Sequence, residues 1–267
     1  MLGVFWLASG SWFTLAVGRY QGQETGELAL FRQVEGRLAP GDVVLGDRCY
    51  SASCMGASLP ARSVDSVGRQ HQRRHAAFRR GQRLGYEEHL LVWHKPARPA
   101  WLDEATYQQV PETLQVRELR VRVTRKGLRT GMLLVVTPLL EPITYTKEEL
   151  ADLDRCRWHA ALDLRAIKTG LGMDILRSQT PAMVRKELWM DVLASNLMRR
   201  VMATAAVQAG LVPRMRSFTG ALQAVHALGP ALLFAAATAK AALLAALSST
   251  IRAHRVVSVQ AVKTSAL

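Results

Sequence analysis

Residues 41–50 read Gly-Asp-Val-Val-Leu-Gly-Asp-Arg-Cys-Tyr, a short apolar run that ends in turn residues. The run predicts a buried strand over Asp42–Leu45, followed by Gly46 and Asp47. Open α/β sheets gather their functional groups just past the C-terminal ends of such strands. Asp47 is therefore a candidate site residue, and the competing interpretation is an aspartate that caps a turn or a helix.

The segments beside this strand predict further short elements. Val4–Leu7 and Trp12–Val17 have the composition of two strands, joined by an Ala-Ser-Gly-Ser turn. A helix is expected over Thr25–Arg37, and another over Ser53–Arg62. Asp42–Leu45 would then lie between two helices.

The pattern between Asp65 and Leu140 is that of β-structure, with prolines in the loops. Strands are predicted at His89–Trp93, Val116–Val123 and Met132–Leu139.

A long helical region follows. Thr146 and Glu149 have the spacing of a capping box, which predicts a helix start, and the helical pattern continues to about Arg255. Breaks are expected at Thr180-Pro181 and at Pro213. Strands, a β-rich block and then helices predict a mixed α/β fold with an insertion and an all-α tail.

Composition excludes several classes of protein. A chain of 267 residues with 49% hydrophobic side chains can bury a sizeable core, which excludes intrinsic disorder. Three cysteines exclude a disulfide framework, and Cys49 and Cys54 have no second pair with which to bind zinc. The 35 Lys+Arg against 21 Asp+Glu give a net charge of +14, which favours a polyphosphate or an anionic membrane surface as partner.

Two apolar stretches bear on the membrane. Met1–Val17 lacks the basic residue and the cleavage site of a signal peptide. Pro230–Leu247 is long enough to span a bilayer but is rich in alanine, with Lys240 at its centre. A buried helix is the favoured interpretation, so we expect a protein of the cytoplasm with no membrane partner.

Basic residues are concentrated in three places. The segment 69–83, Arg-Gln-His-Gln-Arg-Arg-His-Ala-Ala-Phe-Arg-Arg-Gly-Gln-Arg, holds six arginines and no acid. A second cluster lies on the strand-like Arg117–Arg129 and a third on the helical Arg155–Lys168. Clusters on three elements favour a nucleic-acid track over a single solvated loop. His71 and His75 lie among arginines that repel a metal cation, so they are expected to contact phosphate or bases, or to lie on the surface.

At Gly41–Tyr50 the sequence resembles the second-aspartate motif of the RNase-H-like DDE transposases, in the group of the bacterial insertion-sequence-four type. The resemblance runs from about Tyr20 to about Arg255. It includes further blocks in the same order, at Arg69–His75, Lys95–Pro99, Arg157–Lys168, Gly172–Arg177 and Thr180-Pro181.

The resemblance implies an RNase-H-like mixed sheet flanked by helices, and DNA transposition as the activity. Family members hold two divalent metals, Mg²⁺ or Mn²⁺, with three carboxylates. The metals activate water or a 3′-hydroxyl for attack on a phosphodiester. Four regions are implied: residues 1–64 as the first half of the core without its leading strand, 65–142 as a β-rich insertion, 143–210 as the second half with the signature helix, and 211–267 as a helical C-terminal region.

The chain departs from the family at the catalytic carboxylates. The first aspartate belongs to a strand upstream of the hairpin that begins at Met1, so we expect an N-terminally truncated copy without it. The signature pattern Y-x2-R-x3-E-x6-K reads Asp154, Arg157, Ala161 and Lys168, so the glutamate position holds Ala161.

Neighbouring acids are not expected to replace the glutamate. Asp163 lies about 200° around the helix from Ala161, and Asp154 lies roughly 10 Å along the axis. Asp47 remains the single predicted catalytic and metal-binding residue, which is too few for tight binding of the metals.

The resulting hypothesis is a catalytically inactive, transposase-like protein that binds double-stranded DNA of insertion-sequence ends in the nucleoid, as a homodimer if the family pattern holds. Its predicted DNA-binding residues are Arg69, Arg73, Arg74, Arg79, Arg80, Arg157, Arg165 and Lys168. The alternatives are a non-catalytic module that inhibits an intact transposase, a basic protein with no role on DNA, and a transposase completed in trans or by an upstream start.

Overall fold

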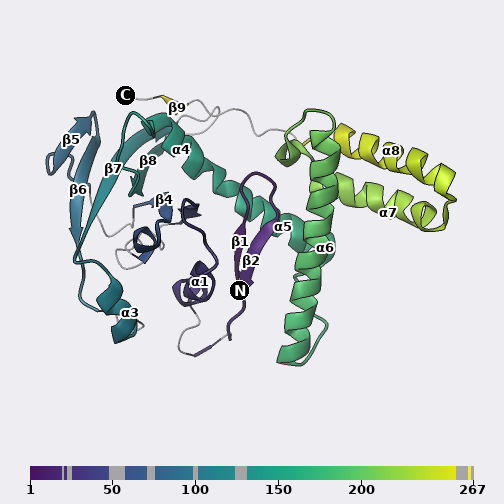
Figure 1. Cartoon of the computed structure of the whole chain (residues 1–267), viewed down its shortest axis with the longest axis horizontal. Coiled ribbons are helices and arrows are strands. Elements are labelled where there is room, and N and C mark those ends of the chain that lie inside the picture. Colours follow the sequence, from purple (N-terminus) through teal and green to yellow (C-terminus); the bar gives the residue numbers. More distant parts are fainter. Residues whose placement is uncertain are drawn as a thin grey trace. The chain divides into compact units, whose positions relative to one another are not determined.

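The computed structural model describes residues 1–19, 21–22, 26–47, 58–70, 76–98, 102–123, 131–256 and 264–265. The chain forms two compact units (Figure 1). The sheet unit comprises Met1–Leu2, Ala16–Arg157 and Gln260–Leu267, and the helical unit comprises Gly3–Leu15 and Trp158–Val259. The four-part division implied by the family resemblance stays a prediction.

A mixed sheet is the centre of the sheet unit. Its strands lie in the spatial order β3 (Val43–Gly46), β4 (Asp65–Arg69), β8 (Gly131–Thr137), β7 (Thr113–Val123), β6 (Glu88–His94) and β5 (Gln82–Gly85), and β9 (Thr264–Ser265) pairs with β7. β3 and β4 run parallel, and the other neighbours are antiparallel. The predicted α/β class with a mixed sheet, flanking helices and C-terminal helices is confirmed.

The two faces of the sheet carry different helices. On one face, Val67, Leu119 and Val135 are fully buried and form a cluster with Leu150 and Ala151 of α4 (Lys147–Cys156). Figure 1 shows α4 lying across the ends of these strands. On the opposite face, Trp93, Val116 and Val136 line a small apolar cavity together with Phe31 of α1 (Glu27–Glu35). Alternation of side chains along each strand produces this division.

Polar contacts fix the N-terminal end of α4. Thr146 and Glu149 form the predicted capping box. Lys147 Nζ donates to the carbonyl of Tyr86 at 2.8 Å, and Arg117 Nη1 donates to the carbonyl of Tyr145 at 2.6 Å. Burial lowers the pKa of the Lys147 amine, although the carboxylates of Glu87 and Glu88 favour its charged form.

Most of the predicted elements are present. The two N-terminal strands form a hairpin, β1 (Leu2–Phe5) and β2 (Trp12–Ala16), and α1 and β3 occupy their predicted places. The predicted burial of β3 is wrong, because β3 lies at the edge of the sheet and Val43 is exposed. The strands predicted within 89–139 are β6, β7 and β8. Of the helix predicted over Ser53–Arg62, residues 53–57 lie outside the described part and Pro60–Arg62 form a 3₁₀ turn, η1.

Three short elements were not predicted. β4 reads Asp-Ser-Val-Gly-Arg and β5 reads Gln-Arg-Leu-Gly, with few β-branched or aromatic residues, so their conformation comes from pairing with neighbouring strands. The helix α3 (Glu104–Gln109) is capped by Asp103, which accepts from the Thr106 amide at 2.8 Å.

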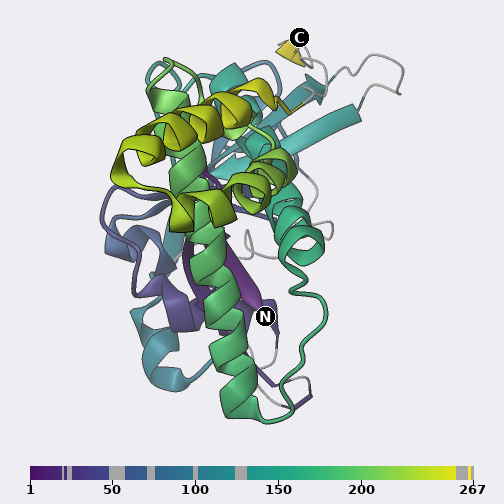
Figure 2. The same cartoon turned by 90° about the vertical axis from the view of Figure 1, so that its right-hand side faces the viewer.

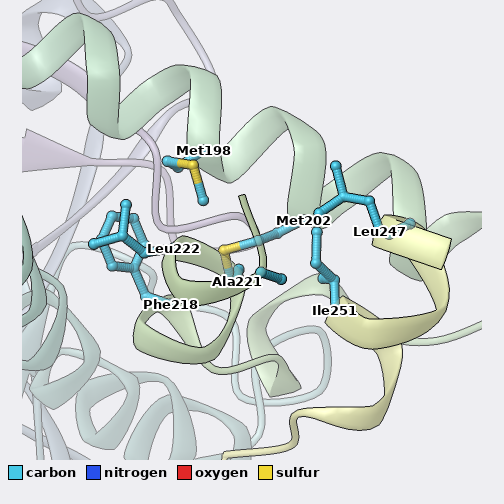
Figure 3. Packing of buried hydrophobic residues seen from close by; sticks show 9 residues of the cluster. Met198, Met202, Phe218, Ala221, Leu222, Leu247 and Ile251 are labelled. Carbon is cyan, nitrogen blue, oxygen red and sulfur yellow. The ribbon is translucent and has the colours of Figure 1, made fainter. Parts of the chain in front are cut away.

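The helical unit contains α5 (Trp158–Leu171), α6 (Pro181–Val207), the 3₁₀ turn η2 (Pro213–Met215), α7 (Phe218–Phe234) and α8 (Ala237–Ala253). The predicted breaks at Thr180-Pro181 and Pro213 are confirmed, because Thr180 caps α6 and Pro213 begins η2. α7 and α8 pack side by side against the C-terminal part of α6 (Figure 2). Their core consists of Met198, Met202, Phe218, Ala221, Leu222, Leu247 and Ile251 (Figure 3).

The prediction of a buried helix over Pro230–Leu247 is wrong. The segment is divided at Ala235–Ala236 between α7 and α8, and most of it is exposed, including Phe234 and Lys240. Alanine stabilises a helix through its high propensity and needs no burial, so the apolar composition misled the prediction. In the described residues, no helix has the length and apolarity needed to cross a membrane.

Two methionines of α6 test the core of the helical unit. Met202 is 1% exposed, whereas Met190 on the same helix is 64% exposed. Met202→Ala is expected to lower the free energy of unfolding by about 3 kcal/mol, because it leaves a cavity. Met190→Ala is expected to change it by less than about 0.5 kcal/mol. Chemical denaturation measures both, and equal effects would contradict the described packing.

Candidate functional site

The parallel strands β3 and β4 place two charged residues at one edge of the sheet. Leu45 is paired with Val67 in their register. Asp47 lies two residues after Leu45, and Arg69 lies two residues after Val67. Because side chains alternate along a strand, Asp47 and Arg69 lie on the face that α4 covers. The predicted position of Asp47, directly after a short strand, is confirmed.

Helix α4 brings a second pair of charges to this edge. Arg69 Nε donates to Asp154 Oδ2 at 3.1 Å, and the Asp154 side chain is fully buried. Arg157, the residue that ends α4, has its Nε 3.9 Å from Asp154 Oδ1. Its Nη1 lies 3.6 Å from Asp47 Oδ1. We call Asp47, Arg69, Asp154 and Arg157 the charge cluster.

Two guanidinium groups thus balance two carboxylates in the cluster. Asp154 has an arginine at each of its oxygens, which offsets the large cost of burying a carboxylate. Asp47 differs because its side chain is 56% exposed. Its ion pair with Arg157, at 3.6 Å, is long for a hydrogen bond, so water competes with Arg157 for this carboxylate.

Asp154 was not predicted to join Asp47. The sequence argument measured its distance from Ala161 along the helix, but the relevant neighbour is Arg157, which is three residues away. The i,i+3 spacing of Asp154 and Arg157 could have predicted their ion pair, because an aspartate and an arginine at this spacing are neighbours on a helix surface.

The other predicted DNA-binding residues are distributed over the described chain. In the sheet unit, Arg79 and Arg80 are exposed in the loop before β5. Arg165 and Lys168 are exposed on α5, which belongs to the helical unit. Arg73, Arg74, His71 and His75 lie outside the described residues.

Asp163 is engaged elsewhere in the helical unit. Its two carboxylate oxygens accept from Arg199 Nη2 and Arg214 Nη2, both at 2.6 Å. Gly10, in the turn of the β1–β2 hairpin, packs so closely on these side chains that a Cβ would lie 2.2 Å from Arg214 Nη1. Burial lowers the pKa of His159 nearby, and the Arg214 charge lowers it further. Asp163 is thus paired with two arginines of its own unit, and the expectation that it does not replace a catalytic glutamate stays a prediction.

Part of the chain is similar to a curated transposase. Over 152 residues, 55% of this chain, the sequence is 30% identical to the transposase InsG for insertion sequence element IS4 of Escherichia coli (strain K12). The chain spans 32% of the length of that relative. No protein-family model matches the chain.

The residues of the charge cluster do not fit a pair of divalent metals. Asp47 faces the positive charge of Arg157, and Asp154 faces both Arg157 and Arg69. Ala161, which is predicted to stand at the glutamate position, has a methyl group that supplies no ligand. Within the described ranges, no three or more His, Cys, Asp or Glu side chains are grouped so as to hold a metal.

Two aspartates of α4 test the cluster. Asp154→Asn removes a buried charge and leaves Arg69 and Arg157 without it, so we expect the free energy of unfolding to fall by about 3 kcal/mol. Asp152→Asn breaks the exposed pair with Arg155 on the same helix and is expected to cost less than about 1 kcal/mol. Urea denaturation at neutral pH compares the two, and a small effect of Asp154→Asn would contradict the described ion pairs.

Proposed function

We propose that this chain is a transposase-like protein that binds double-stranded insertion-sequence DNA but does not cleave it. Three observations support the proposal: the similarity to an insertion-sequence transposase, the net charge of +14, and the exposed basic residues before β5 (Arg79 and Arg80) and on α5 (Arg165 and Lys168). Binding to DNA backbone phosphates is the interaction that such a charge favours. The strand cluster predicted at 117–129 adds less, because Arg117 is fully buried and Arg120 is paired with Glu87.

The pairing of Asp47 with Arg157 carries the proposal of inactivity. In a two-metal reaction, the carboxylates must present their oxygens to cations that lie roughly 3.5–4 Å apart. Here the guanidinium of Arg157 already supplies the positive charge beside Asp47. A guanidinium donates hydrogen bonds, but it cannot coordinate the attacking or leaving oxygen as a metal ion does. A divalent cation at this carboxylate would be repelled by Arg157 and Arg69, so we propose that Mg²⁺ or Mn²⁺ is not bound tightly.

Arginines of the cluster also support binding to phosphate. The Arg157 side chain is 24% exposed and that of Arg69 is 36% exposed, so both remain within reach of an anionic ligand at the sheet edge. A phosphate oxygen would be a stronger partner for Arg157 than the solvated Asp47 carboxylate, because charge-assisted bidentate bonds are among the strongest. We propose that DNA backbone binds at this edge in the nucleoid, and that dimerisation follows the family pattern.

A supercoiled-plasmid nicking assay tests the catalytic part of the proposal. The chain, its Ala161→Glu variant and its Asp47→Ala variant are each incubated with Mg²⁺ or Mn²⁺. We expect no nicking from any of the three, because a single restored carboxylate does not complete a two-metal site. A nicking endonuclease in the same buffer serves as positive control. Nicking by the unmodified chain that Asp47→Ala abolishes would show the proposal of inactivity to be wrong.

Salt dependence tests the DNA-binding part. Affinity for a mixed-sequence duplex is measured between low and moderate salt by fluorescence anisotropy. The Arg79→Gln, Arg80→Gln double variant is expected to reduce the slope of log K against log salt by about 2, since two phosphate contacts are lost. Lys240→Gln, which alters an exposed lysine on α8 outside the three basic clusters, is the control and is expected to leave the slope unchanged. A flat affinity for the unmodified chain would count against any role on DNA.

A further inference from the structure

A buried carboxylate lies between strands on the face of the sheet opposite the charge cluster. Glu118 of β7 is 2% exposed and has hydrogen-bond partners on three side chains. Gln70 Nε2 and Trp93 Nε1 donate to Oε1 at 3.1 and 3.3 Å, and His89 Nε2 lies 3.2 Å from Oε2. His89 is the cross-strand partner of Glu118 and is fully buried.

The second ring nitrogen of His89 reaches the basic segment, residues 69–83. His89 Nδ1 lies 2.7 Å from the carbonyl oxygen of Arg80. A carbonyl only accepts, so Nδ1 carries a proton. Nε2, the other ring nitrogen, faces Oε2 of the carboxylate whose Oε1 accepts from Gln70 and Trp93. The imidazole therefore links Glu118 to the backbone of Arg80.

Further contacts hold the same short loop against the sheet. The ring of Phe78 packs on His89 with centroids 4.8 Å apart, and Arg120 lies over the Phe78 ring at 4.9 Å. Gly81 has φ +76°, and a Cβ there would lie 2.0 Å from the Leu90 carbonyl, so the chain approaches β6 as closely as it can. Arg79 and Arg80 themselves are exposed.

Glu118 also reaches the other end of the basic segment. Gln70, which donates to Glu118, directly follows Arg69 of the charge cluster. Because side chains alternate along a strand, Arg69 points to α4 while Gln70 points to Glu118. One buried carboxylate is thus bonded to Gln70 directly and to Arg80 through His89.

We propose that Glu118 and His89 are positioning residues for DNA binding, which hold Arg79 and Arg80 at a fixed place relative to Arg69. This inference rests on the DNA-binding function proposed above. Its physical basis is preorganisation, because arginines on a backbone that is already ordered lose less entropy when they bind phosphates. Neither residue contacts DNA in this proposal.

Four variants separate positioning from general stabilisation of the sheet. His89→Leu removes both links of the imidazole, and Phe78→Ala weakens the same loop without leaving a buried charge unpaired. Glu118→Gln preserves the geometry, because its amide oxygen accepts from Gln70 and Trp93 while its NH₂ donates to His89 Nε2. Val116→Ala is the control, since it disturbs a buried position of the same strand that packs in a cluster with Trp93 and Val136.

Two readouts are taken on each full-length variant: hydrogen exchange of the amides of residues 78–81, and affinity for a mixed-sequence DNA duplex at fixed salt. His89→Leu and Phe78→Ala are expected to speed exchange of the loop and to weaken DNA binding about tenfold, whereas Glu118→Gln and Val116→Ala change neither by more than about twofold. In the His89→Leu background, the Arg79→Gln, Arg80→Gln substitutions should cost much less affinity than in the unmodified chain.

Several results would overturn the inference. One is that hydrogen exchange of the loop is unchanged in both His89→Leu and Phe78→Ala. Another is that Val116→Ala loses as much affinity for DNA as these two variants do. A third is that the effects of His89→Leu and of the arginine substitutions on affinity are additive. If His89→Leu does not fold, the inference is tested by Phe78→Ala, which is expected to weaken DNA binding, and by Glu118→Gln, which is expected to leave it unchanged. Failure of the proposed function is seen separately, as an unmodified chain that binds no DNA while the exchange of its loop still responds to Phe78→Ala.

Discussion

The guanidinium of Arg157 is the contact on which the charged edge of the sheet depends. It faces Asp47 after β3 and Asp154 on α4, and so joins two elements that are far apart in the sequence. Asp154 is buried, and a buried carboxylate is tolerated where cations or donors surround it. The C-terminal end of α4 must therefore lie where Arg69 and Arg157 can both reach Asp154. The same requirement places a positive charge beside the one predicted catalytic aspartate.

The two ends of α4 are held by polar contacts and its middle by apolar ones. Lys147 and Arg117 bond backbone carbonyls near its start, Leu150 and Ala151 pack on the sheet, and the charge cluster lies at its end. Apolar packing alone leaves a helix free to slide by a turn, whereas hydrogen bonds near its start and ion pairs at its end select one position. In a transposase-like protein without cleavage, Arg69 and Arg157 would serve two purposes, because they place positive charge beside the buried Asp154 and offer it to phosphate.

The sequence predicted the class of fold, most strands and helices, and the place of Asp47, because these depend on local hydrophobic patterns and turn residues. It missed β4, whose five residues Asp-Ser-Val-Gly-Arg show no strand pattern and take their conformation from two neighbouring strands. It also missed that Asp154 and Asp47 share Arg157 as a partner, since that arrangement depends on how α4 crosses the sheet. The wrong prediction for Pro230–Leu247 has the same origin, because composition reports helix propensity but not what surrounds a helix.

Strand β4 has a consequence for how the chain tolerates change. Arg69 and Gln70 are adjacent, yet the first completes an ion pair under α4 and the second a hydrogen bond to Glu118 on the other face. A slip or insertion of one residue would exchange the faces of these side chains and of Val67, and would break both sets of contacts at once. A strand that the residue pattern hardly specifies is thus fixed in register by its last residues. In related sequences, length changes are expected to be excluded from this strand and to accumulate in the loops on either side.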